Sequence, residues 1–400
     1  MTLLILFRIQ IRKSVIENIF LKVEDIMPKK NDTLAQAKDA KKDEFYTLFA
    51  DIQKEINAYL EYDSDTFRNK TVLLPCDDPE WSNFTRFFAQ NFENFGLKKL
   101  ISTSFAASSK AKKYSSHNIE LYHQMTLFET DSPQFDEEKS KSRGKIFTLS
   151  RDANNSGNID IDDLEWTYLE GDGDFRSEEV KKLRDEADII VTNPPFSLFR
   201  EFLAWIMEAN KKFLVIGNIN CITYKEVFPL IKDNKVWLGN GIGRWISGFI
   251  VPDSYELYGT EARMEDGKRI IATNNCLWLT NLEHGRRHQP LQLMTLEDNK
   301  KYSKHAKIRD NGYMKYINFD ALHIPFTDAI PSDYDGYMGV PITFLDKYNP
   351  EQFELIGNSS DLAGPLIING KLKNNPGRFY TMTDEGPHRE YDRIVIRRKS

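Results

Sequence analysis

Asn193 begins a four-residue stretch, Asn-Pro-Pro-Phe, whose residue types could hold a planar amine. The Asn193 amide oxygen and the Pro194 carbonyl oxygen can both accept hydrogen bonds from one exocyclic NH₂ group, which keeps the nitrogen lone pair available for attack. Phe196 can stack on the ring that carries the amine. The candidate catalytic residues are therefore Asn193, Pro194, Pro195 and Phe196. The alternative is a proline-rich turn with a purely structural role.

The elements around this stretch place it where ligands bind in α/β proteins. The apolar run 189–191 is typical of a buried strand, and prolines end a strand abruptly because they lack an N–H and fix φ. Residues 196–212 carry apolar side chains at helical spacing. Since ligands in open α/β sheets bind beyond the carboxyl ends of strands, this elbow lies where chemistry is expected. A second candidate stretch, 171–175, ends the strand predicted before it.

Strands and helices alternate along most of the chain, which predicts an α/β fold with a parallel sheet and helices on both faces. Residues 106–145 are polar and charged, and we expect a loop or a partly disordered insertion there. Beyond about residue 282 the alternation stops, and short strands and turns are expected. The predicted strands are 72–74, 97–105, 166–175, 188–192, 211–220, 235–240 and 274–281, and the predicted helices are 82–96, 177–187, 196–212 and 224–234.

Three other stretches have weaker claims to function. Residues 152–163 have oxygen-bearing side chains at the positions of a calcium-binding loop, but no flanking helices, so an Asx-rich turn is the better interpretation. Residues 238–245 contain three glycines without the strand and helix that frame a dinucleotide site, and we predict a loop. Residues 283–290 gather His284, Arg286, Arg287 and His288 without further metal ligands, which favours a surface or DNA-facing loop.

The composition excludes several classes of protein. The formal net charge of −6 argues against a uniformly basic nucleic-acid binder, although five lysines (98, 99, 110, 112 and 113) lie between residues 98 and 116 with no acid among them. Such a tract is either a phosphate-contacting surface or a solvated face. Three widely spaced cysteines make neither a disulfide framework nor a zinc site, which fits a reducing cytoplasm. The apolar N-terminal run is too short for a membrane span. Met27 opens a more usual polar start, so residues 1–26 are either a mis-assigned start or an added helix.

Several motifs in order resemble the EcoRI-type adenine-specific DNA methyltransferase family, from about residue 41 to 400. They are KKDEFYTLFADI, PCDDPEWSNF, EGDGDFRSEE, DIIVTNPPFSLFREF, TNLEHGRR and MGVPITFLDKYNPEQFELIG. The resemblance implies a Rossmann-like core that uses S-adenosylmethionine to methylate adenine N6 in double-stranded DNA, without a metal. Base flipping would expose the amino group. It also implies a carboxyl-terminal target-recognition region, and we expect a monomer.

The resemblance also implies roles for individual residues. Asn-Pro-Pro-Phe matches the catalytic tetrapeptide, and the motif at 43–47 helps to hold the methionine end of the cofactor. Thr47 would cap the following helix, whose N-terminus suits a carboxylate. The first loop lacks the usual Gly-x-Gly, and the second strand ends without the usual ribose-binding acid, so ribose recognition is unassigned. The expected cofactor-binding residues are Phe45, Tyr46, Thr47, Pro75, Asp77, Glu80, Asp172, Asp174 and Phe175. The basic tracts, rather than the resemblance, give the expected DNA-binding residues, which are Arg286, Arg287, Lys112 and Lys113.

These inferences divide the chain into three parts. Residues 1–40 form an N-terminal extension, residues 41–282 a catalytic core with an insertion at 106–165, and residues 283–400 the target-recognition region. Two alternatives stay open from sequence. The same tetrapeptide serves cytosine N4 or other amines in other methyltransferases, and the chain could be a DNA-binding relative that has lost catalysis.

Overall fold

Four adjacent parallel strands lie at the centre of the computed structural model, which describes residues 46–78, 82–106, 132–242, 246–251, 262–265, 267–272, 275–368, 371–373 and 377–399. In spatial order these strands are β3 (Lys99–Ser104), β2 (Thr71–Leu74), β6 (Ile189–Thr192) and β7 (Lys212–Asn218). β2 and β6 are completely buried, as expected for parallel strands covered on both faces. Their carboxyl ends meet at one edge of the sheet, which is where the candidate residues follow.

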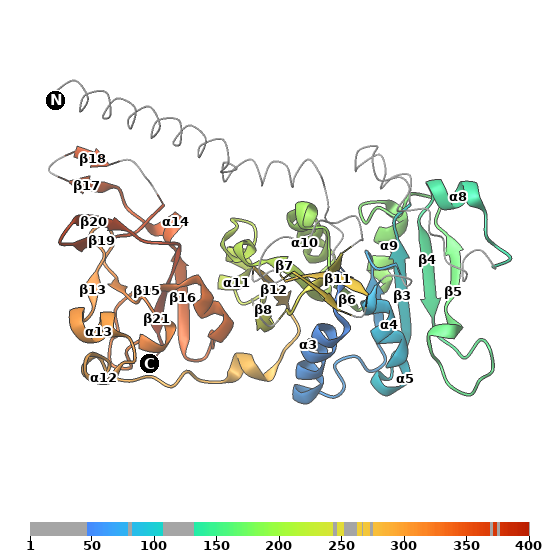
Figure 1. Ribbon diagram of the computed structural model, residues 1–400, viewed down its shortest axis with the longest axis horizontal. Helices are drawn as coiled ribbons and strands as arrows, with labels where there is room; N and C mark the ends of the chain where they lie inside the picture. Colours follow the sequence, from blue (N-terminus) through green and yellow to red (C-terminus); the bar gives the residue numbers. More distant parts are fainter. Residues whose placement is uncertain are drawn as a thin grey trace, which may run out of the picture.

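Helices cover both faces of this sheet (Figure 1). α3 (Phe49–Tyr62) and α4 (Asn83–Gln90), followed by the short α5 (Phe92–Phe95), contribute apolar side chains to one core cluster. α9 (Glu178–Glu186), α10 (Phe199–Glu208) and α11 (Phe228–Lys232) contribute to the cluster on the opposite face. Alternate residues of β6 divide between the two, with Ile190 in one cluster and Val191 in the other. The predicted α/β fold with helices on both faces is therefore confirmed.

The flanks of the sheet are antiparallel, so the prediction of a fully parallel sheet was wrong there. β4 (Lys145–Leu149) and β5 (Glu165–Tyr168) extend the sheet beyond β3, and β12 (Cys276–Thr280) and β8 (Trp237–Ile242) extend it beyond β7. β5 ends at Tyr168, and residues 169–175 form turns. The described part of the insertion, from residue 132, includes α8 (Glu137–Ser142) and β4.

The glycines at 239 and 241 lie in β8, where we had predicted a loop. A Cβ atom at Gly239 would lie 2.2 Å from Glu55 Oε1 and 2.7 Å from Trp278 Cβ. The absence of a side chain therefore lets α3 pack closely over β8. A second, four-stranded sheet lies beside this region, in the order β1 (Tyr46–Thr47), β9 (Phe249–Val251), β11 (Lys268–Ile271) and β10 (Arg263–Glu265).

The carboxyl-terminal part is built on a separate five-stranded sheet, orange to red in Figure 1. Its strand order is β13 (Met314–Lys315), β14 (Leu322–His323), β15 (Met338–Pro341), β21 (Arg393–Arg398) and β16 (Phe353–Asn358). α12 (Leu296–Tyr302), α13 (Ala306–Asn311), α14 (Ser359–Leu362) and two hairpins complete it. The hairpins are β17 (Leu366–Ile368) with β18 (Lys371–Lys373), and β19 (Tyr380–Thr383) with β20 (Gly386–Arg389).

Apolar packing joins the carboxyl-terminal sheet to the central sheet. Phe353 of β16 and Ile396 of β21 belong to the same buried cluster as Phe213 of β7 and Ile231 of α11. The two parts therefore share a continuous core. Within the described ranges, no helix is long and apolar enough to cross a membrane.

Candidate functional site

Hydrogen bonds bring three of the predicted stretches together at the carboxyl edge of the central sheet. The Thr103 hydroxyl donates to the Pro75 carbonyl oxygen at 2.9 Å, and the Thr192 hydroxyl donates to Asp77 Oδ2 at 2.6 Å. The Ala106 amide, just beyond β3, donates to the Asp172 carbonyl oxygen at 2.8 Å. The loops after β2, β3 and β6 and the turn at 171–175 thus lie next to one another at this edge.

The Asn-Pro-Pro-Phe stretch leaves β6 as a rigid elbow. Asn193 is half-buried, with its side-chain oxygen enclosed, and Pro194 is buried. Pro195 precedes a 3₁₀ turn, η3 (Phe196–Leu198), in which the Leu198 amide donates to the Pro195 carbonyl oxygen at 2.9 Å. Phe196 packs at the margin of the core cluster on the α3 face. The elbow therefore presents the Asn193 amide from the end of a central strand.

Asp77 faces into the protein. It is 5% exposed, and its two carboxylate oxygens accept hydrogen bonds from the hydroxyls of Ser82, at 2.7 Å, and Thr192. Burial raises the pKa of Asp77 to about 7 against the effect of these hydrogen bonds, and the charge of Asp78 adds to the increase. Because the carboxylate is buried and directed toward these two hydroxyls, this geometry does not support the expected direct contact between Asp77 and a cofactor.

Two side chains of the turn at 171–175, which we expected at the cofactor, contact other residues of the chain. The Asp174 carboxylate forms an ion pair with Arg176, with Oδ2 2.6 Å from Nη2. Phe175 is 5% exposed and packs edge-on against Phe202 and Trp205, with ring centroids 5.1 and 5.7 Å away. The Phe175 ring is therefore part of the core, and a cofactor contact by this residue stays a prediction.

Glycine is required where this turn approaches β3. Gly173 has φ +85°, and a Cβ atom there would lie 2.3 Å from the Ser104 carbonyl oxygen. The backbone at 172–174 can therefore lie directly against the end of β3.

Thr47 is a buried residue whose side-chain hydroxyl makes no hydrogen bond within the described structure. It lies in β1, paired with Phe249, and is 2% exposed. Its Oγ1 has no hydrogen-bond partner in the described structure, whereas its carbonyl oxygen accepts from Asn83 Nδ2 at 2.8 Å. The prediction that Thr47 caps α3 was wrong, because Leu48 is the N-cap residue and no side chain caps the helix. An orphaned hydroxyl beside a helix N-terminus suits the polar end of a ligand.

Four of the expected site residues, Phe45, Glu80, Lys112 and Lys113, lie outside the described residues, as does the N-terminal stretch before residue 46. Tyr46 is half-buried in β1.

Arg286 and Arg287 both make internal contacts. The Arg287 side chain is buried, with its guanidinium 3.7 Å from the centroid of the Trp237 ring. Arg286 is partly exposed, forms an ion pair with Asp346 at 2.5 Å and donates to the Asn240 carbonyl oxygen. The charged group of Arg287 is enclosed by the protein, so this structure gives no support to the predicted phosphate contact.

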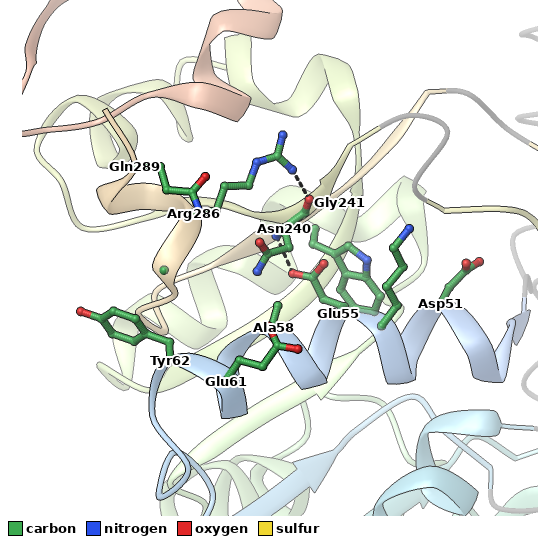
Figure 2. A pocket seen from close by; sticks show the side chains of 12 residues that line it. Asp51, Glu55, Ala58, Glu61, Tyr62, Asn240, Gly241, Arg286 and Gln289 are labelled. Atoms are coloured by element: carbon green, nitrogen blue, oxygen red, sulfur yellow. Dashed lines mark hydrogen bonds between the residues drawn. The ribbon is translucent and has the colours of Figure 1, made fainter. Parts of the chain in front are cut away.

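A pocket of about 670 Å³ lies between α3, β8 and the 3₁₀ turn η6 (Gly285–His288) (Figure 2). Glu55 reaches from α3 to accept hydrogen bonds from the Asn240 amide at 2.8 Å and the Tyr59 hydroxyl at 2.9 Å. Burial raises the pKa of Glu55 to about 7. Glu55 was not among the predicted site residues, although its i, i+4 spacing from Tyr59 would allow the two side chains to meet on one face of a helix. The residues that line the pocket include Asp51, Lys54, Glu55, Asn240, Trp278 and Arg286.

The loop at 152–163 is confirmed as an Asx-rich turn. Asp152 accepts hydrogen bonds from the amides of Ser156 and Gly157, and Asp163 accepts from those of Ala153 and Asn154. The carboxylates therefore bind the loop's own backbone. The described residues contain no group of three or more His, Cys, Asp or Glu that could hold a metal.

Comparison with known proteins assigns the family. Residues 33–399 match the family described as adenine-specific methyltransferase EcoRI. The type II methyltransferase M.EcoRI of Escherichia coli is 47% identical over 343 residues, which is 85% of this chain and 94% of that protein. M.MgeORF184P of Mycoplasma genitalium is 33% identical over 370 residues, covering 91% of this chain and 98% of the relative. M.MpnI of Mycoplasma pneumoniae is 32% identical over 373 residues, covering 91% and 97%.

No solved structure matches the chain. The family match nevertheless spans the central sheet and the carboxyl-terminal sheet, and it includes the elbow after β6 and the turn at 171–175. The chain therefore belongs to the EcoRI family of adenine-specific DNA methyltransferases.

Proposed function

We propose that the enzyme transfers a methyl group from S-adenosylmethionine to adenine N6 in duplex DNA, with Asn193 as the residue that orients the amino group. The observation that carries this proposal is the position of the Asn-Pro-Pro-Phe elbow. It follows the carboxyl end of β6, in the middle of the parallel strands, and hydrogen bonds tie its strand to the loop after β2. Ligands of open α/β sheets bind at this edge.

The strand order supports a Rossmann-like core. Four parallel strands connect through helices on both faces, and the antiparallel strand β12 lies between β7 and β8. We place the catalytic core at 41–282 and the target-recognition region at 283–400, because the five-stranded sheet lies entirely within the latter. Residues 1–40 would be an extension. The DNA substrate implies a cytoplasmic enzyme, and we propose that it acts as a monomer.

The chain's own residues would act mainly by positioning. Adenine hides its amino group inside the duplex, so the base must be flipped out to reach Asn193. The Asn193 Oδ1 and the Pro194 carbonyl oxygen would each accept one N6 hydrogen, and Phe196 would stack on the ring. When bound, S-adenosylmethionine supplies an electrophilic methyl group on a positively charged sulfur. Holding the amine in line with that methyl group lowers the entropic part of the barrier.

The residues around the strand ends fit this methyl donor. The unsatisfied Thr47 hydroxyl beside the N-terminus of α3, a helix of 14 residues, would bind the carboxylate of the methionine part. The backbone at Pro75 and at 172–174 would form the wall of the site, with Asp172 and Asp174 at its rim. Tyr46 lies next to Thr47 in β1.

Substitution of Asn193 tests the proposal. We expect Asn193→Ala to bind S-adenosylmethionine and DNA normally and to lose about 10²–10³ in single-turnover rate, because the lost hydrogen bond acts mainly in the transition state. Asn193→Asp keeps an acceptor and should lose less. Asn158→Ala, in an exposed loop, is the matched control. Nucleoside analysis of the DNA product should show N6-methyladenine. A stably folded Asn193→Ala enzyme with a normal single-turnover rate would refute the proposal.

A further inference from the structure

A group of buried hydroxyl side chains holds the loop after β2. They come from three elements, and each is at most 2% exposed: Ser82 and Thr85 at α4, Thr103 and Ser102 on β3, and Thr192 on β6. Thr103 donates to the Pro75 carbonyl oxygen, while Ser102 donates to the Asp77 carbonyl oxygen. The loop contains no glycine, so side-chain hydroxyls hold it in place of a glycine-rich backbone turn.

Asp77 is the residue at which these contacts converge. Its carbonyl oxygen accepts from Ser102 and, at 3.2 Å, from Thr85. Its carboxylate accepts from Ser82 at 2.7 Å and from Thr192 at 2.6 Å. Asp77 therefore links α4, β3 and β6 through hydrogen bonds that are all buried.

The bond to Thr192 matters because Thr192 is the residue before Asn193. Thr192 is completely buried and ends β6, and the two prolines after Asn193 restrict the backbone on the other side. The Asn193 backbone is thus held from both directions. A shift of Thr192 would move the Asn193 amide relative to the flipped base.

We infer that Asp77 is a positioning residue for catalysis, which orients Asn193 by accepting a hydrogen bond from Thr192. This inference rests on the proposed function, in which Asn193 binds the target amine. It differs from a cofactor-binding role, because the Asp77 carboxylate is directed toward hydroxyl groups of its own chain.

The ionised carboxylate is the form that accepts both hydrogen bonds. Protonation would turn one oxygen into a donor and force Ser82 or Thr192 to rotate. Because burial raises the pKa of Asp77 to about 7, this change falls near neutral pH. The neighbouring charged group that acts on Asp77 is Asp78. The elements packed against Asp77 contribute only uncharged hydroxyl groups to its hydrogen bonds, from Ser82 and Thr85 at α4, Ser102 on β3 and Thr192 on β6. Both hydrogen bonds to the Asp77 carboxylate are therefore present above about pH 7, and they are weakened below it.

Two substitutions remove the link in different ways. Thr192→Val keeps the shape of the side chain but removes the donor, and Thr192→Ser restores the donor. Asp77→Asn keeps the shape but cannot ionise. Thr280→Val is the matched control for a lost buried hydroxyl, because Thr280 lies in β12 of the same sheet and donates to the Phe213 carbonyl oxygen at 2.6 Å. Glu55→Gln is the control for a second buried carboxyl group with a pKa of about 7.

Single-turnover methylation of preformed complexes with DNA and S-adenosylmethionine should be followed from about pH 6 to pH 8, together with both binding affinities and the melting temperature. We expect Thr192→Val to lose about 10²-fold in rate with its affinities retained, since a small misplacement is enough for such a loss. Thr192→Ser should recover the rate, and Thr280→Val should keep it. The unaltered enzyme should gain rate as pH rises through about 7, as should Glu55→Gln, whereas Asp77→Asn should lack this inflection.

A folded Thr192→Val enzyme with a normal rate would overturn the inference, as would an Asp77→Asn enzyme that keeps the inflection. Measuring Asn193→Ala alongside these variants distinguishes a failure of the proposed function from a failure of the positioning role of Asp77. A normal Asn193→Ala rate refutes the proposed function itself. An impaired Asn193→Ala with a normal Thr192→Val refutes only the positioning role of Asp77.

Discussion

At the scale of single residues, Thr47 is a buried polar group that folding alone does not explain. Its hydroxyl is unsatisfied within the described structure, and it lies beside the N-terminus of α3. A buried hydroxyl without a partner costs about 1–3 kcal/mol. A ligand that accepts its hydrogen bond would recover this cost on binding.

We predict that Thr47→Val weakens S-adenosylmethionine binding by about 10-fold, which corresponds to one lost hydrogen bond to a charged group. The same change should leave the melting temperature equal or higher, because valine fills the space without an unsatisfied hydroxyl. Isothermal calorimetry and thermal unfolding measure the two effects. Thr167→Val, on the exposed side of β5, is the control. Unchanged affinity would place the methionine end of the ligand elsewhere.

At the scale of elements, α3 docks through two buried carboxyl groups. Asp51 Oδ2 accepts hydrogen bonds from the Ser247 amide at 2.8 Å and the Ser247 hydroxyl at 3.0 Å, and Glu55 accepts from the Asn240 amide. These bonds fix the helix against β8 and against the segment that leads to β9. Burial raises the pKa of both groups, so α3 packs less favourably once they ionise.

Glu55 should make the stability of the protein depend on pH. Its pKa rises from the ordinary value of 4.5 in the unfolded chain to about 7 in the folded state. The associated stability is fully present below about pH 4.5 and is lost as pH rises through about 7, by up to about 3 kcal/mol. We therefore predict that Glu55→Gln reduces the loss of stability between about pH 5 and pH 8 in urea unfolding. The exposed Glu61→Gln serves as control, and parallel curves for Glu55→Gln and the unaltered enzyme would contradict the prediction.

At the scale of the whole molecule, Arg286 connects the central sheet to the carboxyl-terminal part. It donates to the Asn240 carbonyl oxygen in β8 and pairs with Asp346 in the 3₁₀ turn η8 (Ile342–Lys347) of the carboxyl-terminal part. Phe344 and Leu345 of the same turn belong to the shared core. Charge pairing and apolar packing therefore act at the same junction, which sets how a recognition region would lie relative to the catalytic edge.

Breaking this pair should destabilise the junction. We predict that Arg286→Ala costs about 2 kcal/mol in urea unfolding, somewhat below the range for fully buried pairs, because Arg286 is partly exposed and Asp346 would lose its partner. Arg286→Ala combined with Asp346→Asn should recover part of the loss. S-adenosylmethionine affinity should not change. Arg68→Ala, from an exposed pair with Asp65, is the control, and an equal effect in both variants would argue against a role for the junction.

The sequence by itself determined the features that local signals encode. Apolar runs, prolines and turn residues were sufficient to predict β2, β6, β7 and the elbow at Asn193, because these depend on neighbouring residues. The ordered motifs were sufficient for the family. The Asx-rich turn at 152–163 could likewise be predicted, since its hydrogen bonds are local.

Only the tertiary structure decided the direction of the flanking strands and the partners of the site residues. Asp77 meets Thr192 across 115 residues of sequence, and no local pattern shows that its carboxylate faces inward. Phe175 enters the core, and Arg287 lies on Trp237, because residues distant in the chain provide their packing. Charge and hydrophobicity indicate what a side chain can do, whereas long-range packing determines which partner it meets.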